Sequence, residues 1–310
     1  MRIAVMGSGG IGSCYGGMLA QAGSDVTLIA RGAHLQAIQQ NGLEVMQRED
    51  SFMVNVPATD DPSQVGPVDL VLFTVKTYQN QEAIPLLKPL IGDDSLVLTL
   101  QNGVESAGEI ADVIGADHVL PGAAYMIGNI ISPGVVRQGT FPARIAFGES
   151  AGPRTPRAEA VQETLTKGGI TTELSDDVIK VLWSKVLYNT PANGLASVAR
   201  IAPRDLMDMP QGAELFKMAI AEVAAVANAS GVEIGDDDVQ TAISLIANRP
   251  LGARGSMQID LADGKPLELE AIVGCVGRIG RNLGVPTPIH DLVNTMLLPH
   301  ISGPPEAPCA

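Results

Sequence analysis

Cysteine is scarce in this sequence, and the few cysteines lie too far apart for a disulfide framework. Among 310 residues there are three, Cys14, Cys275 and Cys309, and no C-x-x-C pair. Their odd number and wide spacing indicate a reducing compartment, so we expect a cytoplasmic protein. Histidine is also rare, at His34, His118, His290 and His300. The four form no H-x-x-x-H or similar cluster, so the sequence predicts no metal site.

Long apolar runs and an excess of basic residues are missing as well. No run reaches the roughly 18–20 residues that a membrane span needs, and the residues after Met1 read as a strand, not as a signal peptide. With 34 acidic against 20 basic residues, the formal net charge is −14. A field of that sign disfavours nucleic acid and anionic membranes as partners, although a local basic spot can still bind a small anionic ligand.

What the chain does have is apolar material for a sizeable core. Hydrophobic residues make up 45% of the 310, which suits two domains better than one. Strand-like and helix-like segments alternate in the first half, and the runs at 69–76 and 95–103 are almost purely apolar. Such runs are typical of strands buried on both faces, so we expect an α/β fold with a doubly wound parallel sheet. Residues 43–56 read as two strands around a polar turn, and 134–149 as further strands with an antiparallel extension as one option.

The second half reads as helices alone, with glycine and proline between them. The expected helices are 177–192, 212–229, 236–247, 257–262, 266–283 and 288–298. We therefore predict a dinucleotide-binding sheet domain over 1–174, an all-helical C-terminal domain over 175–302 and a disordered tail over 303–310. The pair His290–Asp291 is interpreted as the start of a helix, not as a catalytic pair.

A glycine-rich turn joins the first strand to the first helix. Its sequence, MGSGGIG, places Gly7, Gly9 and Gly12 in the G-x-G-x-x-G spacing. The spacing alone is a weak signal, but a strand before it and a helix after it favour dinucleotide binding over a plain turn. Gly7 allows the tight turn, Gly9 lets the backbone approach a pyrophosphate, and Gly12 lets the helix pack closely on the strand. The predicted contacts are Gly7, Ser8, Gly9, Gly10, Ile11 and Gly12.

The choice of cofactor is expected to be made at the end of the second strand. An acid about 20 residues beyond the glycines would bind the ribose 2′-hydroxyl of NAD. This chain has Ala30 and Arg31 there, and no acid before Glu44. Because a guanidinium suits a 2′-phosphate, Arg31 predicts NADP, with a solvated surface arginine as the alternative interpretation.

Polar residues also end the next two expected strands. Lys76 follows one apolar run, and Gln101 and Asn102 precede a glycine in the other. Ligands of doubly wound sheets bind beyond the carboxyl ends of the strands, which makes Lys76 and Asn102 candidate cofactor contacts. Each residue taken alone is equally well explained as a first solvated side chain or an ordinary Asn-Gly turn.

Three polar side chains stand in the otherwise apolar segment LWSKVLYNTPANG, at 182–194. Lys185, Asn189 and Asn193 recur every four residues, so they share one face of a helix. An amphipathic surface helix is the alternative, but it would normally offer Glu, Lys or Gln, whereas Lys with two Asn suits a carboxylate and a hydroxyl. Pro191 lies inside the stripe, and we expect it to kink the helix.

Together these marks resemble the ketopantoate reductase (2-dehydropantoate 2-reductase) family over nearly the whole chain. The marks are GSGGIG at 7–12, Arg31, VKT at 75–77, QNG at 101–103, K-x-x-x-N-x-x-x-N at 185–193, SMQID at 256–260, KPLELE at 265–270 and GVPTP at 284–288. The resemblance implies a Rossmann domain followed by a helical domain. It also implies reduction of ketopantoate to pantoate with NADPH, on the route to pantothenate and coenzyme A. Gly194 departs from the proline of many relatives.

The resemblance further implies roles at matching positions. Lys185 would donate the proton, and Glu268 would lie near the nicotinamide ribose and the reacting centre, in both a catalytic and a cofactor-binding role. The implied substrate contacts are Asn102, Lys185, Asn189, Asn193 and Ser256. For Glu268 a second interpretation stays open, because an acid in the first turn of a helix also interacts favourably with the helix dipole.

Three functions remain open from the sequence. The first is an NADPH-dependent reductase of ketopantoate, and the second is a reductase of another branched 2-oxo acid. The third is a protein that binds NADP as a sensor without turnover. The joint presence of Lys185 and Glu268 favours an enzyme. The choice between monomer and homodimer, and any backbone contact of the cofactor around 122–128, stay undecided.

Overall fold

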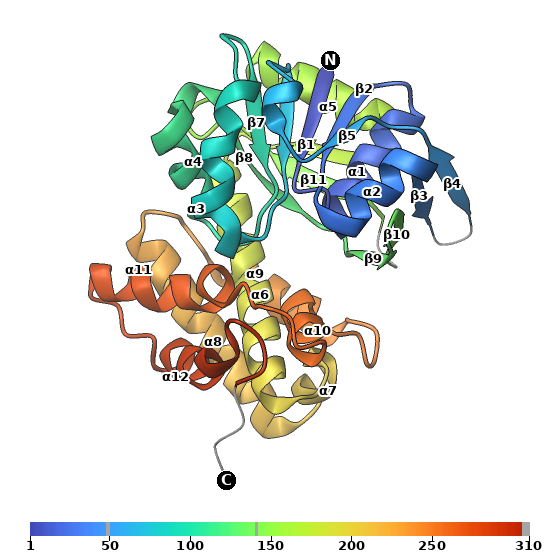
Figure 1. Ribbon diagram of the computed structural model, residues 1–310. Coiled ribbons are helices and arrows are strands. Elements are labelled where there is room, and N and C mark those ends of the chain that lie inside the picture. Colours follow the sequence, from blue (N-terminus) through green and yellow to red (C-terminus); the bar gives the residue numbers. More distant parts are fainter. Residues whose placement is uncertain (48–49, 140–141, 306–310) are drawn as a thin grey trace. The chain divides into compact units, whose positions relative to one another are not determined.

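The computed structural model (Figure 1) describes residues 1–47, 50–139 and 142–305. The chain forms two compact units. The first consists of Met1–Gln101 and Ser106–Val181, and the second of Asn102–Glu105 together with the chain from Leu182 onward. None of the helices in the described ranges combines the length and the apolar character that a membrane span requires. Residues 306–310 of the predicted disordered tail, Cys309 included, lie outside the described residues.

A mostly parallel sheet forms the centre of the first unit (Figure 1). Among the described residues it has eight strands, in the order β12-β11-β8-β7-β6-β1-β2-β5. Their bounds are β1 Arg2–Met6, β2 Asp25–Ile29, β5 Ala58–Thr59, β6 Leu70–Phe73, β7 Leu96–Thr99, β8 Val119–Ala124, β11 Arg144–Phe147 and β12 Thr171–Leu174. All neighbours are parallel except β8 and β11. From β5 to β8 this is the strand order of a dinucleotide-binding sheet, and the predicted α/β fold is confirmed.

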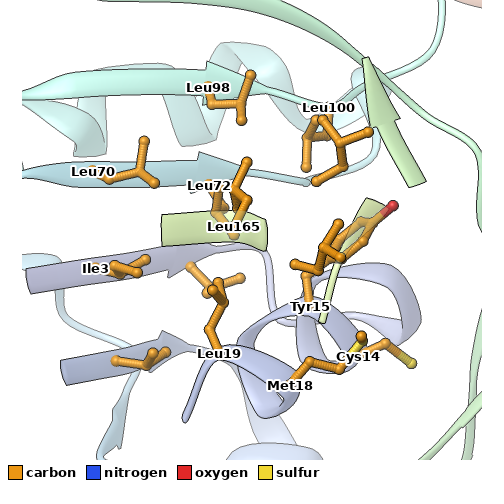
Figure 2. Packing of buried hydrophobic residues seen from close by; sticks show 14 of the residues in the cluster. Ile3, Cys14, Tyr15, Met18, Leu19, Leu70, Leu72, Leu98, Leu100 and Leu165 are labelled. Atoms are coloured by element: carbon orange, nitrogen blue, oxygen red, sulfur yellow. The ribbon is translucent and has the colours of Figure 1, made fainter. Parts of the chain in front are cut away.

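Both faces of this sheet are covered, which explains the purely apolar strands. In β1, Ile3 and Val5 belong to one buried cluster, while Ala4 and Met6 belong to another. Figure 2 shows the first cluster, where Leu19 of helix α1 lies against the strands. Each buried Val, Leu, Ile or Met side chain contributes about 1.5–3 kcal/mol when it leaves water. Burial on both faces therefore fixes which strands lie centrally and where their carboxyl ends meet.

Helices and a smaller sheet complete the first unit. The helices are α1 Gly10–Gln21, α2 Gly32–Asn41, α3 Asn80–Ala83, α4 Ser106–Ile114 and α5 Pro156–Lys167. The 3-10 segments are Pro62–Gln64, Thr77–Gln79, Ile84–Leu90 and Ala116–His118. The smaller sheet has the order β4-β3-β10-β9, with β3 Leu43–Met46, β4 Ser51–Val54, β9 Gly128–Ser132 and β10 Val135–Gln138. The predicted strand pair at 43–56 and the strands at 134–149 are confirmed, β11 with antiparallel pairing to β8.

Helices make up the described part of the second unit, as the sequence predicts. They are α6 Val178–Ala199, α7 Pro203–Met207, α8 Pro210–Ala229, α9 Asp236–Ala247, α10 Ser256–Ala262, α11 Cys275–Leu283 and α12 Pro288–Leu297. A π-helical turn, Glu270–Gly274, precedes α11, and a 3-10 segment, Leu298–His300, follows α12.

Helix α6 is longer than its sequence suggests. The predicted end at residue 192 is wrong, because the helix continues past Pro191 to Ala199. An interior proline costs about 3 kcal/mol, but residues 190–197 are all buried and their packing offsets that loss. Gly194 permits the close packing, since a Cβ there would lie 2.9 Å from Cγ1 of Val293 on α12.

The helix predicted over 266–283 begins later than expected, and this corrects the position of Glu268. Glu268 precedes the helical residues, and its carbonyl oxygen accepts a hydrogen bond from Ile272 N–H at 3.0 Å. The π turn follows directly, and Thr190 Oγ1 of α6 donates to the Ile272 carbonyl at 2.5 Å. A carbonyl bonded by a neighbouring hydroxyl is a known cause of such irregular helical turns, and single π turns are frequent at functional sites.

Candidate functional site

The glycine-rich turn is fixed to the ends of two neighbouring strands. Gly7 has φ +92°, which favours glycine, and a Cβ there would lie 2.6 Å from the backbone nitrogen of Val75. Thr74 Oγ1 donates to the Gly7 carbonyl at 2.9 Å, and Ser8 N–H donates to the Ile29 carbonyl at 3.0 Å. The turn therefore lies at the carboxyl ends of β1, β2 and β6, where ligands of such sheets bind.

A different physical reason explains why glycine occupies each of the other positions of the turn. A Cβ on Gly12 would overlap Thr74, which agrees with close packing of α1 on the sheet. A Cβ on Gly10 would overlap the carbonyl of Gly128, a contact with β9 that the sequence did not reveal. At Gly9 the nearest atom would be 4.0 Å away, so the space in front of this residue is open.

The open space lies before the N-terminus of α1. Gly9 is the N-cap of this helix, and no side chain of the described residues caps it. The first-turn N–H groups of a helix need acceptors, and the helix dipole favours a negative group there. The uncapped N–H groups at the start of α1 and the absence of a Cβ at Gly9 leave donors and room for a pyrophosphate. The residues of this turn therefore fit a dinucleotide.

A buried histidine is linked to this turn by a chain of hydrogen bonds. Gly134 N–H donates to His34 Nδ1 at 3.0 Å, so neutral His34 carries its proton on Nε2, which lies 3.2 Å from Ser13 Oγ. Ser13 Oγ in turn donates to the carbonyl of Ser8 at 3.0 Å. Burial lowers the pKa of His34, which keeps the ring neutral and this chain of hydrogen bonds intact.

Arg31 and Lys76 lie just beyond the strands that the turn contacts. Arg31 is the N-cap of α2, two residues after β2, and its side chain is 58% exposed with Nη1 4.0 Å from Glu82 Oε2. Lys76 is the N-cap of the 3-10 segment after β6 and is half-buried. Gln101 is buried and structural, because its Nε2 donates to the Val75 carbonyl at 2.9 Å and to Asn80 Oδ1 at 2.7 Å.

In the second unit, three of the predicted site residues form one hydrogen-bonded group. Lys185 Nζ on α6 donates to Asn102 Oδ1 at 3.0 Å, and Asn102 Nδ2 donates to Glu268 Oε2 at 3.4 Å. Glu268 is 5% exposed. The segment Asn102–Glu105 thus brings its asparagine to the lysine and the glutamate, which are 83 positions apart in sequence.

The environment of Lys185 brings its acidity near neutral pH. Burial lowers the pKa of Lys185 to about 8, while the negative charge of Glu268 acts in the opposite direction and raises it. A lysine with a pKa near the working pH can both hold a proton and release it. This is the property that a general acid needs.

The remaining predicted residues of the helical half lie around Asn193. Its Nδ2 donates to Asn189 Oδ1 at 3.0 Å, and its Oδ1 accepts from Met257 N–H at 3.2 Å. A Cβ on Gly255 would overlap this Asn193 amide. Asn193 is 1% exposed, so it orients Asn189 and the start of α10, where Ser256 is the first residue. A direct substrate contact by Asn193, Asn189 or Ser256 stays a prediction.

The described residues offer neither a cluster of metal ligands nor an activated thiol. Within them, no set of three or more His, Cys, Asp or Glu side chains could hold a metal ion. Cys14 and Cys275 are buried, and burial raises the pKa of each thiol to about 12. His290 lies in the first turn of α12, which agrees with its interpretation as part of a helix start.

Comparison with known proteins gives matches along most of the chain. The family model described as ketopantoate reductase PanE/ApbA matches residues 3–152, and the model of its C-terminal part matches residues 177–299. A 2-dehydropantoate 2-reductase from Halobacterium salinarum is 32% identical over 291 residues, which cover 93% of this chain and 95% of that protein.

Solved structures agree with these matches. A PanE/ApbA family ketopantoate reductase from Ralstonia eutropha is 34% identical, with a TM-score of 0.89 over 97% of this chain and 98% of that one. D-mandelate dehydrogenase, solved with NADH and anilino(oxo)acetate, has a TM-score of 0.90 over 97% of this chain and 98% of that one. At 24% identity the second likeness shows the fold alone.

Proposed function

This chain belongs to the ketopantoate reductase family, and from that premise we propose that it reduces ketopantoate to pantoate with NADPH. The enzyme class that goes with the family is an oxidoreductase acting on a CH–OH group. In the cell the reaction would supply pantoate for pantothenate and coenzyme A. The observation that carries the proposal is the hydrogen-bonded group of Lys185, Asn102 and Glu268.

The glycine-rich turn and the residues beyond β2 and β6 support NADPH as the cofactor. Gly7, Ser8, Gly9, Gly10, Ile11 and Gly12 would hold the pyrophosphate at the start of α1. Arg31 would bind the 2′-phosphate through charged hydrogen bonds, and its exposure leaves the guanidinium accessible. Lys76 would add a second positive charge close to the phosphates. NADPH, when bound, supplies the hydride.

Lys185 would supply the proton in this reaction. The carbonyl carbon C2 of the 2-oxo acid gains a hydride, negative charge develops on its oxygen, and the Lys185 ammonium stabilises that charge and gives up a proton to it. The product is the 2-hydroxy acid, and Lys185 recovers its proton from solvent. Asn102 orients the ammonium, and the Glu268 carboxylate opposes the loss of its charge.

The stripe on α6 and the start of α10 would hold the substrate. Asn189 and Ser256 are both half-buried and keep polar side chains for a carboxylate and a hydroxyl. Asn193 would orient Asn189 by a direct hydrogen bond, and Ser256 through the bond to the N–H of the next residue, Met257. Fixing the carbonyl carbon in one orientation makes hydride transfer effectively unimolecular.

A second candidate keeps the chemistry and changes the acid. The D-mandelate dehydrogenase structure contains an oxo acid with an anilino group in the same fold. The present fold can therefore be adapted to more than one 2-oxo acid. In that case Lys185 and Glu268 would keep their roles, while the residues that contact the rest of the substrate would differ.

Consumption of NADPH by the purified protein tests both candidates and the sensor interpretation. The absorbance of NADPH is followed with ketopantoate and with a panel of other branched and aromatic 2-oxo acids. We expect the highest kcat/KM with ketopantoate. A higher kcat/KM with another acid would favour the second candidate, and binding of NADPH without oxidation by any acid would favour the sensor.

A further inference from the structure

The segment Asn102–Glu105 carries the asparagine of the proposed site. The catalytic and binding roles proposed so far do not explain which residues hold this segment in place. In sequence it interrupts the first unit, yet it clusters with the second. At its first residue, Asn102 contacts Lys185 and Glu268. At its other end, Glu105 contacts a residue for which neither the sequence nor the family match suggested a role.

That residue is Arg278, on helix α11. Its Nη2 lies 2.5 Å from Glu105 Oε2 and its Nε lies 3.4 Å from Glu105 Oε1, so the two groups meet in a bidentate pair. The remaining nitrogen, Nη1, donates to Glu270 Oε2 at 2.9 Å. One guanidinium therefore joins the segment to the π-helical turn that follows Glu268, with the two-pronged geometry that only arginine offers.

Two glycines make this arrangement possible. Gly103 has φ +88°, and a Cβ there would lie 2.7 Å from the carbonyl oxygen of Ala271, so the segment rests on the π turn. A Cβ on Gly274 would lie 2.6 Å from Glu270 Oε2, so its absence leaves room for the carboxylate that Arg278 binds. The close backbone approach at Gly103 and the ion pair at Glu105 therefore hold the same four-residue segment at two points.

We infer that Arg278 is a positioning residue: by holding Glu105 and Glu270 it fixes the segment 102–105 and keeps the Asn102 side chain within hydrogen-bond distance of Lys185. The inference rests on the proposed function, in which Lys185 donates the proton. Arg278 bonds Glu105 and Glu270, so it acts on Lys185 through the segment.

A purely stabilising role explains the geometry less well. The side chains of Arg278 and Glu105 are 40% and 35% exposed, and ion pairs at such exposure contribute little to stability. Arg281, one turn further along α11, forms a comparable pair with Asp291 at 2.7 Å but does not contact the segment. Arg281 therefore serves as a matched control for the loss of an arginine from this helix.

Steady-state kinetics test the inference in Arg278→Met, Arg278→Lys and Arg281→Met. We expect Arg278→Met to lower kcat for the reduction roughly tenfold, the loss of one charge-assisted hydrogen bond, with a smaller effect on KM for NADPH. Arg278→Lys should recover only part of kcat, because an ammonium cannot hold two carboxylates in a fork. Arg281→Met should keep the wild-type kcat.

The pKa of Lys185 gives a readout that needs no turnover. Competitive acetylation over a range of pH, followed by peptide mapping, measures it in wild type, Arg278→Met and Glu105→Gln. Loss of the Asn102 acceptor lowers this pKa, by roughly one unit, in both variants. A through-space charge effect would instead raise it in Arg278→Met and lower it in Glu105→Gln.

Opposite shifts, or wild-type values of both kcat and the Lys185 pKa in the two variants, would overturn the inference. If Arg278→Met fails to fold, Glu105→Gln, which keeps the shape of the side chain, carries the kinetic test. Arg278→Lys then carries the pKa test, because it keeps the positive charge: a lowered Lys185 pKa supports positioning, and a through-space effect would leave that pKa unchanged. A wild-type protein that reduces no 2-oxo acid would refute the proposed function instead, while the acetylation result would still report on Arg278.

Discussion

At the residue scale, the protonation state of Lys185 sets the expected pH dependence of the reaction. Burial lowers its pKa to about 8, so the protonated form that the reduction needs is dominant below that pH and lost above it. We expect kcat for reduction to be level below about pH 8 and to fall tenfold per unit above it. A pH profile of kcat measures this directly.

The variant Lys185→Ala is the control for this profile. We expect it to lower the rate of the chemical step by about 10²–10⁴-fold and to remove the limb near pH 8. Lys217→Ala, which removes an exposed lysine paired with Glu214 on α8, should leave both unchanged. Near-normal turnover in Lys185→Ala would exclude this lysine as the proton donor.

A second prediction at this scale concerns Arg31 and the 2′-phosphate. We expect Arg31→Ala to weaken NADPH binding by roughly 10–100-fold and NADH binding far less, because charged hydrogen bonds to the phosphate are lost. Fluorescence titration of the two cofactors measures the ratio. Glu82→Gln, which removes the carboxylate 4.0 Å from Arg31, should not weaken NADPH binding. Equal losses for NADPH and NADH would contradict the role of Arg31.

Sequence patterns found the residues whose chemistry is unusual, and they missed those that support them. A lysine with two asparagines at helical spacing stands out in an apolar segment, and the group of Lys185, Asn102 and Glu268 was suggested by family motifs. The burial of Asn193 and its bond to Met257 depend on the tertiary approach of α6 and α10. Nothing local in the sequence encodes such an approach.

At the scale of elements, two glycines of the glycine-rich turn are predicted to have different roles, one in cofactor binding and one in packing. Gly9→Ala places its Cβ in open space, so we expect unchanged stability with NADPH binding weakened by at least about tenfold. Gly10→Ala places its Cβ on the Gly128 carbonyl and should destabilise the first unit by about 1–3 kcal/mol. Thermal unfolding and cofactor titration of the two variants measure these effects. Unchanged cofactor binding in Gly9→Ala would remove the pyrophosphate contact.

Element types followed from the sequence, whereas two boundaries did not. Alternation and apolar runs predicted the strands, because burial on two faces leaves a local signature. The predicted end of α6 was wrong because proline and glycine have the lowest helix propensities, and only the packing around residues 190–197 shows why the helix continues through Pro191 and Gly194. The late start after Glu268 reflects a π turn bonded by Thr190, which is a tertiary contact.

At the scale of the whole molecule, the second unit depends on a carboxylate that caps one helix from another. Glu222 of α8 accepts hydrogen bonds from the backbone N–H groups of Ile289 and His290 at 2.8 and 3.1 Å and from His290 Nδ1 at 2.6 Å. Burial alone would raise the pKa of Glu222, but these hydrogen bonds outweigh it, and the net pKa is lowered.

Replacing this carboxylate should destabilise the second unit. We expect Glu222→Gln to lower the free energy of unfolding by about 1.5–3 kcal/mol at neutral pH. Because the folded pKa is below the ordinary value of 4.5, the contribution is fully present above that value and is lost as the pH falls through the folded pKa. Urea unfolding at pH 7 and at pH 4 or lower should therefore show a shrinking difference from wild type. Glu214→Gln on the same helix, an exposed residue, is the control, and a difference independent of pH would contradict the assignment.

The central claim is that the whole molecule transfers a hydride to C2 of ketopantoate with Lys185 providing the proton. The most direct measurement uses NADPH deuterated at the transferred position and follows the label in the product by mass spectrometry. We predict pantoate with one deuterium at C2, formed far more slowly by Lys185→Ala. Bound NADPH that transfers no deuterium to ketopantoate, under conditions where the protein is folded, would contradict the claim.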